Sequence, residues 1–161
     1  MNEEFIRLAG RIRAELPEVE RLVRRFNDGW EKANRTGDDL YLDGVALNLH
    51  GFFGALERVF ERIASTFDEK IPEGANWHQL LLEQMSREVA GVRPAVISPP
   101  VKEILDEFRG FRHVARNIYT FHIDRAKLGR LVAAASVAVV SVSKELDAFA
   151  DFLEHEGGRP K

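Results

Sequence analysis

The chain has 161 residues, of which 45% are hydrophobic and 30% charged, as is typical of one soluble globular domain. It has no cysteine, which excludes disulfides, thiolate metal sites and cysteine nucleophiles. The net charge of −3 is unlike that of a strongly basic nucleic-acid-binding domain, so a contact with RNA would need a local basic patch.

We expect neither a membrane span nor a secretory signal. We expect no stretch to approach the roughly 18 to 20 apolar residues of a membrane span. The first residues, MNEEFIRLAG, begin with acids and lack the apolar centre of a signal peptide. These features predict a cytoplasmic protein without a membrane partner.

The first half of the chain predicts two long helices. Apolar residues recur in steps of three and four over residues 5–30, which marks one helical face. Pro17 predicts a kink or a fresh first turn within that segment. Residues 34–39 are expected to form a loop. A second helix is predicted from an N-cap at Asp38 or Asp39 to Phe67.

The second half predicts a short helix, an irregular segment and two further helices. Asn76 is a candidate cap for a helix from Trp77 to about Val89. After an irregular segment, Ser98 and two prolines begin a helix that we expect to extend through residues 108–123. Asp124 is the predicted cap of a long final helix.

These elements predict an all-α fold, an antiparallel bundle of four to five helices. Residues 1–155 are expected to form a single helical domain, and residues 156–161 a flexible tail.

The stretch FRGFRHVARNIYTFHID, residues 108–124, contains an unusual number of side chains that form hydrogen bonds. On a helical wheel its apolar side chains fall on one face, and a polar face groups Arg109, Arg112, His113 and Arg116. Residues 108–130 hold six Lys or Arg and one acid, a local charge of +5. Guanidiniums suit phosphate, so this face is a candidate anion site. The alternative is a solvated face paired with acids of the first helix or of a second subunit.

The sequence contains no motif for a metal site, a phosphate-binding loop or a serine hydrolase. We find no Glu-x-x-His pair of the di-iron type, no glycine-rich phosphate loop and no G-x-S-x-G. We therefore expect no metal and no cofactor. His50, His78 and His155 are expected to have no chemical role.

The segments FRHVARNIYTF and HIDRAKL resemble the HEPN superfamily, in particular its HepT-like ribonuclease toxins. LDGVALNLHGFFGALERVFERIA, GANWHQLLLEQM and GVRPAVIS are similar to the same subgroup, so the resemblance covers residues 38–153. It implies a helical bundle that forms a homodimer, with a composite site where two motif helices meet. It also implies metal-independent RNA cleavage within a toxin–antitoxin pair. The implied antitoxin is a minimal nucleotidyltransferase, which in some pairs adenylylates the motif tyrosine.

The positions of the family motif can be matched to residues of this sequence one by one. Arg112 matches its arginine, His113 its polar position and Tyr119 its tyrosine, the candidate for adenylylation. The histidine position holds Asn117, which cannot exchange a proton near neutral pH. A second register runs from Arg116 to His122.

These residues suggest roles in cleavage. Arg112, with Arg116 or Arg109, would stabilise phosphate charge, and His113 is the best remaining candidate for proton transfer. Asn117 can orient a ribose hydroxyl or a phosphate. Two alternatives stay open. One is a degenerate subunit that docks a nucleotidyltransferase or binds nucleotide or RNA without cutting, and the other is a purely structural dimerising bundle.

Overall fold

A computed structural model describes residues 2–68, 70–108, 111 and 124–160 of the chain. Its elements are the helices α1 (Glu3–Thr36), α2 (Leu40–Phe67), α3 (Trp77–Met85), α4 (Pro99–Asp106) and α6 (Arg125–Gly158). The described residues form no β-strand, and their one isolated bridge joins Val89 to Arg93. The predicted all-α bundle is confirmed.

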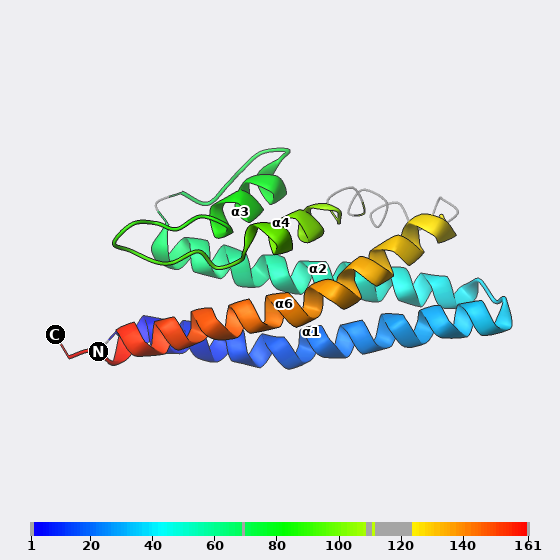
Figure 1. Ribbon diagram of the computed structural model, residues 1–161, viewed down its shortest axis with the longest axis horizontal. Helices are drawn as coiled ribbons and strands as arrows, with labels where there is room; N and C mark the ends of the chain where they lie inside the picture. Colours follow the sequence, from blue (N-terminus) through cyan, green and yellow to red (C-terminus); the bar gives the residue numbers. More distant parts are fainter. Residues whose placement is uncertain (1, 69, 109–110, 112–123, 161) are drawn as a thin grey trace.

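Three long helices build the body of the molecule. Figure 1 shows α1, α2 and α6 side by side, with α3 lying on α2, while α4 packs against α3 and α6. Helix α1 runs in the opposite direction to both α2 and α6, so both termini lie at one end of the bundle. There the amide N–H of Asn2 donates to the carbonyl oxygen of Gly157 at 2.8 Å.

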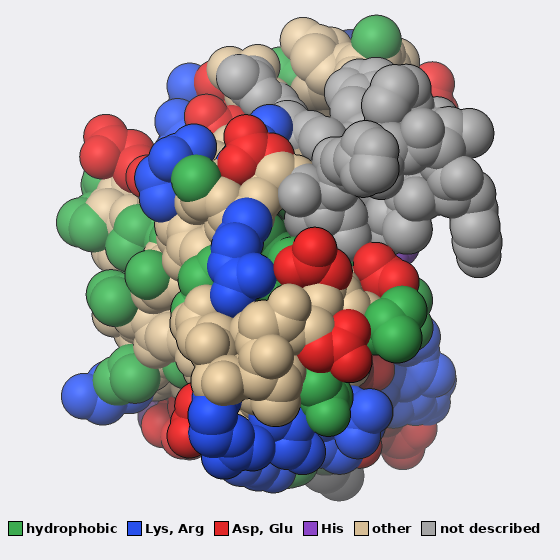
Figure 2. Space-filling model, turned by 90° about the vertical axis from the view of Figure 1, so that its right-hand side faces the viewer, with side chains coloured by type: hydrophobic (Ala, Val, Ile, Leu, Met, Phe, Trp, Pro, Cys, Tyr) green, Lys and Arg blue, Asp and Glu red, His purple; other side chains and the backbone are tan. Residues whose placement is uncertain are grey.

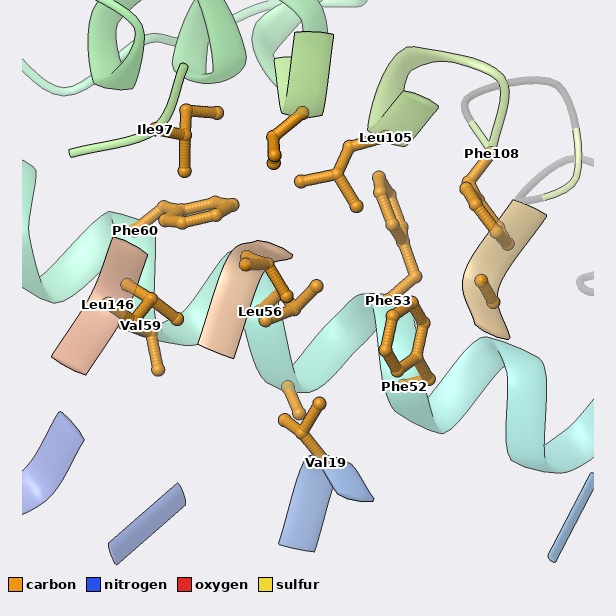
Figure 3. Close-up of a cluster of buried hydrophobic side chains, with 14 of the residues drawn as sticks. Val19, Phe52, Phe53, Leu56, Val59, Phe60, Ile97, Leu105, Phe108 and Leu146 are labelled. Atoms are coloured by element: carbon orange, nitrogen blue, oxygen red, sulfur yellow. The ribbon is translucent and has the colours of Figure 1, made fainter. Parts of the chain in front are cut away.

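Helix α2 is central because it is buried on more than one side. In Figure 3, Phe53 and Phe60 lie on the side of α2 toward Leu105 and Ile97. On its other side, α2 packs against α1 and α6. A helix covered on several sides needs apolar residues around most of its circumference. This explains why α2 is the most apolar of the long helices.

The helix ends confirm some of the predicted caps. The Asp124 carboxylate accepts a hydrogen bond from the backbone N–H of Lys127, as expected for an N-cap. Asp39 and Asn76 precede α2 and α3, but neither makes a side-chain capping bond. Gly37 ends α1 with a φ of 72°, a left-handed conformation that glycine adopts without steric cost.

Three predicted helix ends differ from the structure, those of α1, α3 and α4. Helix α1 is unbroken across Pro17 and continues to Thr36, into the segment expected as a loop. Helix α3 ends at Met85 rather than near Val89. Helix α4 ends at Asp106, where the N–H groups of the next two residues bond three residues back and close the last turn. It therefore stops before the segment that we expected it to carry.

Helix α6 also departs from expectation. It continues to Gly158, past the predicted boundary at residue 155. By length and composition it is apolar enough to cross a membrane, a property that core helices of soluble proteins share. One face of α6 packs on α1, while Val137 and Val140 are exposed on its surface. The prediction that no segment approaches a span is wrong for this helix.

Candidate functional site

The seven predicted site side chains lie outside the described residues. They are Arg109, Arg112, His113, Arg116, Asn117, Tyr119 and His122. The structure therefore defines the surroundings of this motif segment, residues 109–123, and not the arrangement of its own side chains. Two anchors, one before and one after it, fix where the segment begins and ends.

The upstream anchor is aromatic. Phe108 is fully buried, and its ring stacks on Phe53 with centroids 5.7 Å apart and an interplanar angle of 16°. Phe52 lies 6.0 Å from the same ring, and Phe111 is also buried. Burying each aromatic side chain contributes about 2 kcal/mol or more. The residue that directly precedes Arg112 is therefore held close to α2.

The downstream anchor joins the start of α6 to the corner between α1 and α2. The Arg125 guanidinium donates to Asn34 Oδ1 at 2.7 Å and to Asp39 Oδ1 at 3.4 Å. It also lies 5.7 Å from the centre of the Trp30 ring, within cation–π range. A Cβ on Gly129 would come within 2.7 Å of that ring, so glycine permits this close approach.

A cavity of about 230 Å³ opens beside the upstream anchor. Its lining combines carboxylates, one arginine, one histidine and aromatic rings: His50, Phe53, Gly54, Glu57, Arg58, Glu61, Trp77 and Phe111. Since Phe111 is the neighbour of Arg112, the cavity lies at the start of the motif segment. We call it the motif cavity.

A buried acid–imidazole pair stands at this cavity. Glu57 of α2 is only 5% exposed, and its Oε2 lies 3.0 Å from Nδ1 of His78 on α3. The His78 ring also packs against Trp77, with centroids 3.4 Å apart. A carboxylate on one ring nitrogen orients an imidazole and favours one tautomer.

The family of the chain follows from comparison with known proteins. A family model described as HepT-like protein matches residues 44–153. The chain belongs to the HepT-like family. None of the curated proteins or solved structures compared with it gives a match. The matched range runs from α2 to α6 and encloses the upstream anchor, the motif cavity and the motif segment. Of the downstream anchor it includes Arg125, whose partners on α1 and before α2 lie outside the range.

The contact between Glu57 and His78 in this HepT-like chain is not predicted by the sequence. A signal was present, because Ala46, Phe53 and Phe60 form a second apolar stripe of α2 with a spacing of seven. Glu57 lies on that stripe, so its burial could have been expected. Its partner could not, because the contact joins two helices whose packing the sequence does not specify.

The described part of the HepT-like chain contains no cluster of side chains that could bind a metal ion. No group of three or more His, Asp or Glu side chains is placed there to hold an ion. The groups able to exchange a proton near neutral pH at the motif cavity are imidazoles, His50 in its lining and His78 behind it.

Proposed function

We propose that this HepT-like protein is a metal-independent RNA endonuclease, the toxin of a toxin–antitoxin pair. The observation that carries the proposal is the family match over residues 44–153, which encloses the Arg112 to Tyr119 motif. The anchors support it, because they fix both ends of the motif segment on a rigid helical frame. Function depends on the positions of particular side chains rather than on the helical bundle itself.

The proposed reaction is a transesterification within RNA. A base removes the proton of a ribose 2′-hydroxyl, whose oxygen attacks the adjacent phosphorus. The bond to the 5′-oxygen breaks, that oxygen is protonated, and a 2′,3′-cyclic phosphate remains. Arg112, with Arg116 or Arg109, would stabilise the charge on the phosphoryl oxygens. His113 would transfer protons, and Asn117 would orient the ribose or the phosphate.

The proposed assembly is a homodimer in the cytoplasm, with a nucleotidyltransferase antitoxin as its second partner and residues 1–155 as one domain. Figure 2 shows hydrophobic side chains exposed on one side of the bundle. Four large ones are more than half exposed: Leu40, Leu47, Val137 and Val140. Apolar surface left open on a small domain is typical of a protein interface.

We expect Arg112→Ala to lower RNA cleavage about 10²- to 10³-fold, because one donor to the developing phosphate charge is lost. The measurement follows a labelled single-stranded RNA with purified protein in EDTA. Arg24→Ala is the matched control, since Arg24 is exposed on α1 away from the motif cavity. Equal cleavage by Arg112→Ala and wild type would contradict the assignment.

A second function is favoured by one observation, the asparagine at position 117. Without the motif imidazole the chain would act as a binding subunit that docks the nucleotidyltransferase, with Tyr119 as the adenylylation target. Under this alternative the wild type binds RNA or its partner without cutting. Intact mass after co-expression with the partner would then rise by one adenylate, and Tyr119→Phe would abolish the rise. An unchanged wild-type mass would contradict modification at Tyr119.

A further inference from the structure

We propose that an arginine-lined groove between α1 and α2 binds the phosphate backbone of single-stranded RNA and leads it to the motif cavity. This inference deepens the proposed ribonuclease function and rests on it. Figure 1 shows α1 and α2 side by side along the bundle, and the groove follows the first half of α1 and the second half of α2.

Four exposed arginines define the groove. Arg7 and Arg11 lie on α1, and Arg58 and Arg62 lie on α2. Each pair is spaced by four residues, which places both side chains on one helix face, about 6 Å apart along the axis. The two helices run antiparallel, so the pairs form two facing rows.

The groove consists of two neighbouring cavities that share lining residues. One cavity of about 200 Å³ is lined by Arg11, Arg58 and Arg62, over the buried side chains of Leu8, Ile12 and Val59. A second, of about 190 Å³, shares Leu8, Arg11 and Arg62 with it and adds Arg7 and the hydroxyl residues Ser65 and Thr66. Arg58 also lines the motif cavity. Arg58 is therefore shared by the groove and the motif cavity, and the proposed RNA path runs past it toward Phe111.

The groove keeps an excess of positive charge among the described residues. Within the described part of the chain, none of the four arginines forms an ion pair. Arg13, on another face of α1, contrasts with them, because it hydrogen-bonds Asp147, Asp151 and Glu154 of α6. Two carboxylates, Glu4 and Glu15, also line the groove. Four cations and two anions leave a local charge of +2.

Like charges held close together destabilise a fold slightly, and an anion relieves that repulsion. The groove offers a row of forked guanidinium donors, which match the oxygens of successive phosphates. At its inner end the path reaches the Trp77 ring in the lining of the motif cavity. Proteins that bind single-stranded nucleic acid usually combine a positively charged groove, which follows the backbone, with aromatic side chains on which bases stack.

The test measures binding of a fluorescent 2′-O-methyl RNA, which cannot undergo the proposed reaction. The groove variant is Arg11→Gln with Arg62→Gln, because both residues line both groove cavities. The control is Arg24→Gln with Arg25→Gln, which removes the same charge from exposed positions outside the groove. We expect the groove variant to bind at least about tenfold more weakly than the control. The slope of log affinity against log salt should fall by about 1.4, or about 0.7 for each lost phosphate contact.

The outcomes separate this inference from the proposed function. If the groove variant and the control bind alike, the groove is not the RNA path, while the ribonuclease proposal stands. If the wild type does not bind the RNA, both fall. If the groove variant keeps RNA binding but loses retention on phosphatidylserine vesicles, the groove serves a membrane surface and the inference is wrong. Arg7→Gln with Arg58→Gln repeats the test should the first variant fail to fold.

Discussion

Asp68→Ala is expected to lower the free energy of unfolding by about 3–5 kcal/mol, because it leaves a buried guanidinium without its counter-ion. The Arg93 side chain is fully buried, and that of Asp68 is 7% exposed. Their contact is bidentate, with Nε to Oδ1 at 2.9 Å and Nη2 to Oδ2 at 2.8 Å.

The same guanidinium also binds backbone carbonyl oxygens. It donates to those of Gln84, Arg87 and Pro94, in and after α3. The pair therefore ties the end of α2 to the irregular segment between α3 and α4. Without the carboxylate, the remaining guanidinium stays desolvated, and this segment loses its attachment to α2.

Urea unfolding followed by circular dichroism measures the effect. Glu156→Ala is the matched control, because its partner Arg159 is exposed and such a surface pair contributes about 0–1 kcal/mol. A loss for Asp68→Ala no larger than for Glu156→Ala would show that Arg93 is satisfied by its carbonyl contacts alone. Arg93→Ala should destabilise the protein to a similar degree.

His113→Ala is expected to lower RNA cleavage about 10²- to 10⁴-fold, the usual contribution of a positioned acid or base. The reason is Asn117, which stands where the family motif has its imidazole and leaves His113 as the nearest candidate for proton transfer. RNA binding should change little, since the arginines that hold phosphate are retained. Cleavage rate and affinity are measured separately on the same RNA.

His122→Ala is the control for the second register of the motif. If His122→Ala abolishes cleavage and His113→Ala does not, His122 transfers the proton and the second register, from Arg116 to His122, is the functional one. His78→Ala tests the buried pair with Glu57 in the same assay. If none of the three variants lowers cleavage, the reaction uses none of these imidazoles and the proposed role of His113 is wrong.

Much of the fold could be predicted, because the bundle rests on local signals. Apolar steps of three and four marked the long helices, and Asp124 was recognised as the cap of α6. The boundaries that failed depend on packing. Pro17 removes one backbone bond, yet α1 continues because buried residues lie on both sides of it. The sequence does not show that α3 stops at Met85, where the chain turns into the segment held by Arg93.

The site was less accessible to prediction than the fold. The motif residues were found by resemblance and by their clustering on one helical face. The Glu57–His78 contact and the arginine groove join residues of different helices, and only the packing of those helices brings them together. Arg58 shows the difficulty, since in the sequence it is one charge among 23 Lys and Arg residues. In the structure it lines both the groove and the motif cavity.

The most direct test of the account analyses the ends of RNA incubated with the purified protein in EDTA. We expect fragments with 2′,3′-cyclic phosphate ends, because the proposed nucleophile is the neighbouring 2′-hydroxyl, and we expect that Arg112→Ala does not produce them. Intact RNA after incubation with wild-type protein that binds it would contradict the ribonuclease proposal and leave a binding subunit.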